Sequence, residues 1–293
     1  MDFNTESTYQ EYFTKAHDMV RKSVREFIRK EVLPYIDDWE EAGEFPREIY
    51  KKAADVGIMG MGFPEAYGGT PGDIFFQVAV SEELMRSGSG GFCAGLGSLN
   101  IAVPPILNLG TEAQKNKFIP PVLAGEKIAA LGITEPGGGS DVANIQTTAD
   151  RDGDDYIING SKTFITSGCR ADQLTCAVRT GEEGAQGISL MVIEADTPGY
   201  SVSEKLKKTG WWASDTAEIY FDNCRVPAAN LLGQENQGFY GIMTNFQAER
   251  LSLAIMANMT ARMALEEAIK YAKERKAFGK PLAGFQVTRH KLA

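Results

Sequence analysis

Histidine is nearly absent from this sequence. Only two of the 293 residues are histidines, and these, His17 and His290, lie near opposite ends of the chain. We therefore expect neither a Ser-His-Asp triad nor a metal site. Since His17 falls beside apolar residues of an expected helix, we interpret it as a structural histidine with satisfied hydrogen bonds.

Cysteine pairs, excess basic charge and long apolar runs are also missing. The four cysteines form no C-x-x-C pair, which argues against a disulfide framework and for a reducing compartment. With 30 basic and 39 acidic residues, the net charge of -9 does not favour binding to a nucleic acid. No segment approaches the roughly 20 apolar residues that span a bilayer, and the polar N-terminus lacks a leader pattern. We expect a cytoplasmic protein without nucleic-acid or membrane partners.

The hydrophobic content of 43% allows a sizeable core, and apolar spacings of three and four predict helices in the first third of the chain. Pro34 is expected to close the first helix, and Thr111 to cap the last. The expected helices cover residues 9–28, 47–56, 74–86 and 111–120. From Gly238 to about Arg275 the pattern predicts one helix, or a kinked pair, about 55 Å long.

Between these helical regions, the sequence changes to short β-rich runs with turn signals between them. The expected strands cover residues 128–133, 145–149, 156–158, 163–165, 174–178, 189–193 and 217–221. The turn at 151–154 predicts a hairpin. Because no helices separate the strands, we expect an antiparallel barrel or sandwich and not a doubly wound sheet.

The most distinctive motif is a strand that runs into a glycine-rich turn at residues 131–142, LGITEPGGGSDV. Adjacent glycines let backbone amides approach a ligand closely, and Thr134 and Ser140 add hydroxyl groups. A flexible loop is the alternative interpretation. Neither G-x-G-x-x-G nor G-x-x-x-x-G-K-[ST] occurs, so a nucleotide site here would be of neither common type.

Four segments in order resemble the acyl-CoA dehydrogenase family. They are ITEPGGGSDV at 133–142, GSKTFIT at 160–166, ASDT at 213–216, and ERKAFG with FQ at 274–279 and 285–286. The resemblance implies an α+β multidomain fold: an N-terminal helical bundle (1–127), a central antiparallel β-barrel (128–237) and the first part of a C-terminal helical bundle (238–293). Residues 286–293 open a further helix without a cap, so we expect the rest of that bundle to be missing.

The resemblance also implies FAD as cofactor and a fatty acyl-CoA thioester as substrate. The flavin ring edge would be bound by Ile133 and Thr134 and by the strand Phe164, Ile165 and Thr166, with the ring of Phe164 packed on the flavin. Ser140 would lie between the FAD phosphates and the pantetheine arm of the substrate. Three further residues would bind the adenosine and pyrophosphate of an FAD held mainly by a neighbouring subunit: Arg275, Phe278 and Gln286.

The catalytic base is the hardest assignment, because many family members use a glutamate from a segment that this sequence does not contain. Helix geometry places Glu249 on one face with Ile242, Phe246, Leu253 and Met256, so a carboxyl group interrupts an apolar stripe. Burial would raise its pKa towards the value that a general base needs. The alternative is a structural glutamate that pairs with Arg250 or caps another helix. Helix geometry alone does not favour either the catalytic or the structural interpretation.

The resemblance favours Glu249 as the base, because QAER at 247–250 is similar to the segment that carries it in the long-chain and isovaleryl branches. Phe246, Gln247 and Arg250 would then contact the substrate. The implied reaction is α,β-dehydrogenation to trans-2-enoyl-CoA, with electrons passed to an electron-transferring flavoprotein by a homotetramer. An acyl-CoA oxidase on the same scaffold, or a catalytically silent FAD- or CoA-binding subunit, remains the alternative.

Overall fold

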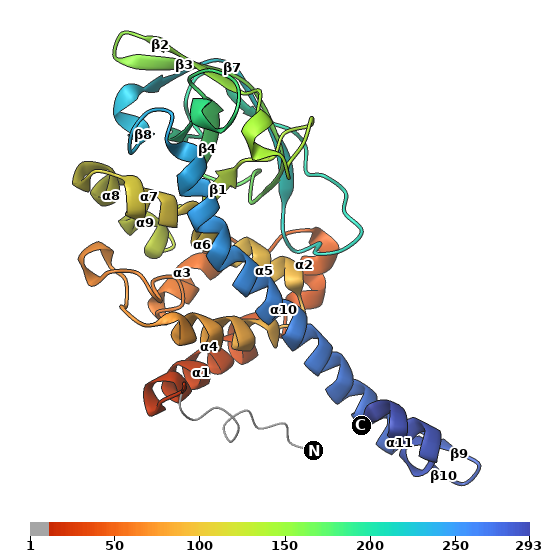
Figure 1. Cartoon of the computed structure of the whole chain (residues 1–293). Coiled ribbons are helices and arrows are strands. Elements are labelled where there is room, and N and C mark those ends of the chain that lie inside the picture. The colour runs from red at the N-terminus through yellow and green to blue at the C-terminus, as the bar shows by residue number, and fades with distance from the viewer. Residues whose placement is uncertain (1–11) are drawn as a thin grey trace.

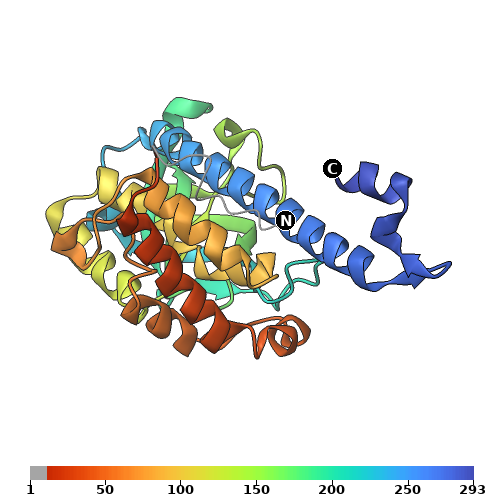
Figure 2. The same cartoon turned by 90° about the horizontal axis from the view of Figure 1, so that it is seen from below.

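The computed structural model describes residues 12–293, and in them three regions follow one another along the chain (Figure 1). Helices α1 to α9 come first, a mixed β-sheet follows, and the long helix α10 then runs from the sheet across the first helices and beyond them. Figure 2 shows the last segment as an arm that projects from the body of the molecule. This order confirms the multidomain α+β class predicted from the sequence.

The N-terminal region contains nine α-helices in residues 12–127. They are α1 (Lys15–Phe27), α2 (Ile36–Ala42), α3 (Glu48–Asp55), α4 (Ile74–Met85), α5 (Gly90–Leu96), α6 (Leu99–Ala102), α7 (Pro104–Leu109), α8 (Glu112–Phe118) and α9 (Pro120–Leu123). A π-helical turn, Ile28–Val32, continues α1 to two residues before Pro34. The expected helices at 47–56, 74–86 and 111–120 are confirmed as α3, α4 and α8.

Side-chain caps explain several of these helix starts. Thr111 and Gln114 form a reciprocal capping box at α8, with Thr111 N donating to Gln114 Oε1 at 2.7 Å. Asp73 caps α4 by accepting from Phe75 N at 2.9 Å. His17 bonds to Asp73 Oδ1 at 3.3 Å and stacks on Phe76, so its predicted structural role is confirmed.

The first helix shows where the periodicity prediction failed. The apolar spacing over 9–28 predicts one buried stripe that includes Met19, Val24 and Phe27, yet Met19 is 73% exposed, while Val24 and Phe27 are buried. Position 9 lies outside the described residues. The buried stripe is therefore narrower than the sequence pattern indicated, and α1 packs chiefly against α4.

The central region is a sheet whose strands lie in the order β6-β7-β3-β2-β4-β5-β8, with β1 beside β4. The strands are β1 (Ala129–Gly132), β2 (Thr148–Asp152), β3 (Asp155–Thr166), β4 (Gln173–Arg179), β5 (Ile188–Glu194), β6 (Tyr200–Val202), β7 (Thr216–Pro227) and β8 (Leu231–Leu232). The predicted hairpin at 151–154 joins β2 to β3, with Gly153 at φ 64 in the turn. Strands β6 and β8 were not predicted.

The expected antiparallel barrel needs correction in two respects. β1 and β2 both pair with β4 in parallel, and the sheet is an open path from β6 to β8. Side chains of β5 alternate between two cores: Leu190 packs towards the helices, whereas Met191 packs into a second cluster shared with β3 and β7. The sheet thus curls around an inner core without closing.

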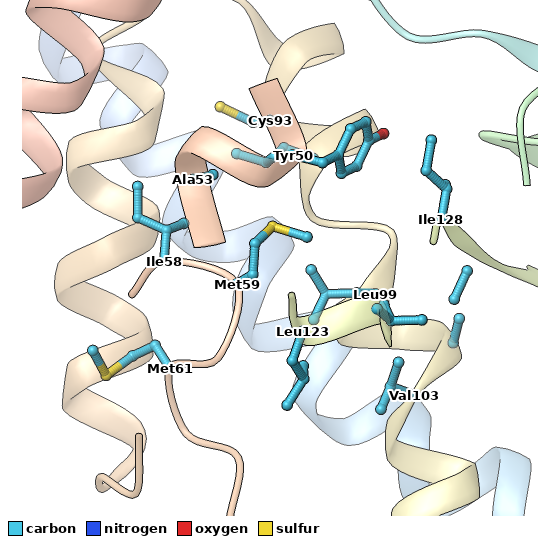
Figure 3. Close-up of a cluster of buried hydrophobic side chains, with 14 of the residues drawn as sticks. Tyr50, Ala53, Ile58, Met59, Met61, Cys93, Leu99, Val103, Leu123 and Ile128 are labelled. Atoms are coloured by element: carbon cyan, nitrogen blue, oxygen red, sulfur yellow. The ribbon is translucent and has the colours of Figure 1, made fainter. Parts of the chain in front are cut away.

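The helices and one face of the sheet share a single large core. Figure 3 shows part of it, where Tyr50 of α3, Met59 of the turn after α3 and Leu123 of α9 converge with Ile128 just before β1. Because this core joins helices to sheet, the two regions pack as one body around the segment that follows β1.

α10 (Gly238–Glu274) is one continuous helix of 37 residues, which settles the choice between one helix and a kinked pair. Beyond it, β9 (Lys276–Ala277) and β10 (Lys280–Pro281) form a small hairpin, and α11 (Gln286–Leu292) follows. We call residues 275–293 the C-terminal arm.

Within residues 12–293, no single helix is long and apolar enough to cross a membrane. By length and composition, only the bent pair Gly90–Leu96 and Leu99–Leu109 could do so together.

Candidate active site

The glycine-rich turn directly follows β1 and is closed by two reciprocal backbone hydrogen bonds. Glu135 and Gly138 each donate to the other's carbonyl at 3.0 Å. A Cβ at Gly139 would lie 3.0 Å from Thr134 Cγ2, so glycine lets the chain pack closely there. Outward from Gly137 and Gly138 no atom lies within 4 Å of such a Cβ. The turn therefore presents accessible backbone, as a ligand cradle requires.

A pocket of about 510 Å³ adjoins this turn. Its lining comes from the turn, the loop before β2, and the middle of β3. The lining residues are Glu135, Pro136, Gly137, Gly138, Asp141, Asn144, Ile145, Gln146, Thr147, Gly160 and Ser161. The predicted ligand-binding turn thus lies beside a cavity, although Ile133, Thr134 and Ser140 do not line it.

Strand β3 brings the second motif next to the turn. Thr163 N donates to Thr134 O at 2.8 Å, which fixes the segment after β1 against β3. Ile133 and Ile165 are buried, while the side chains of Thr134 and Thr166 are partly exposed. The structure therefore places the predicted cofactor residues of the two motifs on adjacent segments.

Phe164 has a strained backbone and an exposed ring. The pairing of β3 with β7 shifts register between Lys162 and Ile165, and Phe164 within this bulge has φ 59. A bulky residue with a left-handed backbone is unusual and costs energy. Its side chain is nevertheless 69% exposed, so the fold holds an aromatic ring away from its own core. Such a ring suits stacking on a planar ligand.

Glu249 lies on α10 where the helix crosses the N-terminal helices. Its side chain is half-buried, and burial raises the pKa of Glu249 to about 7, with the charge of Arg250 lowering it only in part. Among residues 12–293, it forms no salt bridge, so the alternative of an Arg250 pair finds no support. The predicted apolar face is only partly confirmed, because Ile242 is buried whereas Leu253 is 56% exposed.

Asn245 is a neighbour of Glu249 that the sequence analysis missed. It is 7% exposed and donates from Nδ2 to Glu249 Oε1 at 3.1 Å and to Ile101 O of α6 at 2.9 Å. Helix α6 contacts both α10 and β1 (Figure 1), so this bond links Glu249 to the helix that supports the segment before Thr134. The i, i+4 spacing on one helix was the available signal.

Replacing Asn245 with leucine is expected to raise the pKa of Glu249 further. A hydrogen bond to a charged group contributes about 1.5 kcal/mol, which corresponds to a pKa increase of roughly 1 when the bond is lost. NMR titration of glutamate-labelled protein measures this pKa directly. Asn258→Leu, at an exposed position of the same helix, is the control. An unchanged Glu249 titration in Asn245→Leu would show that the amide does not support the carboxylate.

Comparison with known proteins decides the family. Three domain models of acyl-CoA dehydrogenases match the chain: the N-terminal domain at residues 14–126, the middle domain at 130–224 and the C-terminal domain at 236–293. A probable acyl-CoA dehydrogenase from Mycobacterium abscessus has a crystal structure with TM-score 0.94 and 48% identity, covering 96% of this chain and 75% of that one. The chain belongs to the acyl-CoA dehydrogenase family.

Other members of the acyl-CoA dehydrogenase family extend the comparison. The mitochondrial long-chain specific acyl-CoA dehydrogenase of Rattus norvegicus is 43% identical over 287 residues, and these are 96% of this chain but 66% of that protein. The subunit CarC of the caffeyl-CoA reductase-Etf complex of Acetobacterium woodii is 40% identical, covering 96% of this chain and 75% of CarC. A Bacillus anthracis acyl-CoA dehydrogenase solved in complex with FAD has TM-score 0.90 at 32% identity, covering 96% of this chain and 49% of that one.

The three residues that are expected, from the family resemblance, to bind a neighbouring subunit's FAD all lie on the C-terminal arm. Arg275 and Gln286 are exposed, and Phe278 is 96% exposed with φ 51. Figures 1 and 2 both show this arm well separated from the sheet, so the structure does not bring these residues to Thr134 or Phe164 of the same chain. Their predicted role remains a prediction about an assembly.

The expected substrate residues lie on two different elements. Phe246 is partly buried and packs against the core beside Glu249, while Gln247 and Arg250 are exposed on α10. Ser140 is exposed at the end of the glycine-rich turn. The contact of these four residues with an acyl-CoA stays a prediction.

Proposed function

We propose that this chain catalyses the FAD-dependent α,β-dehydrogenation of fatty acyl-CoA thioesters, with Glu249 as the catalytic base. The observation that carries the proposal is the half-buried Glu249 carboxyl group, whose pKa is raised to about 7, in a chain of the acyl-CoA dehydrogenase family. A carboxyl group with such a pKa is suited to remove a proton near neutral pH.

The residues around the glycine-rich turn fit an FAD cofactor. The turn offers open backbone at Gly137 and Gly138, Thr134 and Thr166 offer hydroxyl groups, and Phe164 offers an exposed ring. Ile133 and Ile165 would support the flavin edge from behind, and Ser140 would bind between the phosphates and the substrate. When bound, FAD supplies the acceptor for the hydride that leaves the β-carbon of the substrate.

Glu249 would take the proton from the α-carbon as the carbon–carbon double bond of trans-2-enoyl-CoA forms. Asn245 would hold one carboxylate oxygen while the other faces the substrate. Phe246 lies beside it on the apolar side of α10, and Gln247 and Arg250 offer polar contacts to the thioester or its CoA part. The half-buried setting of Glu249 strengthens the interactions of its carboxylate because it limits the access of water.

The C-terminal arm supports the proposal of a homo-oligomer, in the family arrangement a tetramer. Arg275, Phe278 and Gln286 would reach the FAD of a neighbouring subunit, which explains why Phe278 is so exposed within one chain. An electron-transferring flavoprotein is the proposed electron acceptor, as the name of the related CarC subunit indicates for its own complex.

The test is anaerobic addition of acyl-CoA thioesters of different length and branching to the purified protein reconstituted with FAD. Loss of the oxidised flavin absorbance with formation of enoyl-CoA supports dehydrogenation, and the fastest thioester identifies the substrate. If the flavin is bound but no thioester bleaches it, the chain is a silent FAD- or CoA-binding subunit. Hydrogen peroxide formed in air without a mediator would instead indicate an acyl-CoA oxidase.

A further inference from the structure

A buried ion pair lies directly beneath the glycine-rich turn. Lys162 Nζ is 2.7 Å from Glu135 Oε1, and the two side chains are 0% and 7% exposed. Glu135 comes from the ITEPGGGSDV motif and Lys162 from the GSKTFIT motif, and neither is among the residues expected to touch the cofactor. The two motifs are thus joined by the charged residues to which no role has been assigned.

Glu135 ties three segments together through one carboxylate. Besides Lys162, it accepts from Gln146 N at 2.6 Å, from Thr147 N at 2.9 Å and from Thr147 Oγ1 at 2.6 Å. Burial raises the pKa of Glu135, but the charge of Lys162 and these hydrogen bonds outweigh it and hold the pKa below its ordinary value. Glu135 is therefore ionised at neutral pH, so Lys162 has a fixed counter-charge.

Lys162 also orients the peptide that precedes the turn. Its Nζ donates to Ile133 O at 3.4 Å, and the next peptide along is held by the bond from Thr163 N to Thr134 O. In a trans peptide the C=O and the following N–H point in opposite directions. With Ile133 O held towards Lys162, the N–H of Thr134 points away from it, and in the described residues that N–H has no backbone acceptor.

We propose that Lys162 and Glu135 are positioning residues that hold the Ile133–Thr134 peptide with its free N–H presented to the edge of the flavin. This rests on the proposed function only in that FAD is the ligand. Glu135 and its hydrogen-bond partners Gln146 and Thr147 also line the neighbouring pocket, so the pair sets the position of the glycine-rich turn relative to β3 as well.

The experiment compares FAD binding with folding stability in the full chain. Lys162→Met removes the donor to Ile133 O, and Glu135→Gln removes the counter-charge while it keeps the shape. Flavin fluorescence gives the FAD dissociation constant of the deflavinated protein, and thermal unfolding without FAD gives its stability. We expect at least about tenfold weaker FAD binding in Lys162→Met, with an altered visible spectrum of the flavin that remains bound.

Glu83→Gln is the matched control for loss of a buried charge. Glu83 is 2% exposed in α4 and pairs with Arg25 at 2.7 Å and Arg86 at 3.1 Å, away from the turn. It is expected to lower stability without changing FAD affinity. If a single variant at the turn does not fold, Glu135→Gln/Lys162→Met, which leaves no unpaired charge, takes its place with the same expected loss of affinity.

The outcomes separate this inference from the proposed function. Wild-type affinity and an unchanged flavin spectrum in Lys162→Met, or in the double variant, would overturn the positioning role. The positioning role would also be overturned if Glu83→Gln weakened FAD binding as much as Lys162→Met does, at an equal loss of stability. A wild-type chain that binds FAD but is not bleached by any acyl-CoA would refute the dehydrogenase proposal and still allow the pair to be tested.

Discussion

Replacement of Glu249 with glutamine is expected to slow flavin reduction by acyl-CoA by about 10²- to 10⁴-fold, the usual contribution of a positioned general base. Glutamine keeps the size and the bond from Asn245 but cannot take the α-proton. Stopped-flow measurement of flavin bleaching isolates this step. Glu267→Gln, at an exposed position of α10, is the matched control and should bleach at the wild-type rate.

The pH dependence adds a second measurement of Glu249. Because burial raises its pKa to about 7, Glu249 is protonated below that pH; if it is the base, as proposed, the wild-type rate should fall as pH drops through about 7. The residual rate of Glu249→Gln should not show this fall in rate at low pH. Undiminished bleaching in Glu249→Gln, or the same fall in rate at low pH in both proteins, would place the base elsewhere.

The raised pKa of Glu249 also makes the folding stability of the protein depend on pH. A carboxyl whose pKa is higher in the folded chain takes up protons on folding, so its contribution makes the protein less stable as pH rises from about 4.5 to 7. Glu249→Gln should therefore be more stable than wild type above pH 7, and the difference should disappear below the ordinary glutamate range. Gain of stability with loss of rate is the pattern expected of a functional group held in unfavourable surroundings.

Local rules predicted much of the fold. The capping residue Thr111, the Gly153 hairpin turn and the helical spacing after Gly238 each act over a few residues, and each is confirmed. Helices α2, α5, α6, α7 and α9 were missed because each has seven residues or fewer, which is too short to show a helical period. The parallel pairing of β1 with β4 was also beyond the sequence, because partners so distant along the chain leave no local trace.

The candidate site was predictable where a motif or a helix face carried it. Glu249 was predicted because it interrupts an apolar stripe and because QAER at 247–250 resembles a family segment, yet the exposure of Leu253 on the same face is visible only in the fold. The role of Asn245 required knowing that Ile101 O lies beside it. The Glu135–Lys162 pair likewise joins two residues that lie 27 positions apart in different motifs, so only the fold reveals it.

The backbone of Phe164 leads to the second large effect: Phe164→Gly is expected to weaken FAD binding by about 10- to 100-fold while the stability of the protein without FAD changes little. Covering a phenylalanine ring contributes about 1.5–3 kcal/mol, and all of it is lost with the ring. Glycine, by contrast, adopts φ 59 without strain, which offsets its greater freedom in the unfolded chain. The FAD dissociation constant and the thermal unfolding midpoint measure the two effects.

Two further variants separate the ring from the backbone. Phe164→Trp keeps an aromatic surface and should retain most of the affinity, whereas Asn223→Gly relaxes another left-handed residue, φ 50 in β7, and should leave FAD binding unchanged. If Phe164→Gly bound FAD as tightly as wild type, the exposed ring would have no contact with the flavin. A loss confined to Phe164→Gly would instead give the strained backbone a function, since the bulge would then hold the exposed ring in place for contact with the flavin.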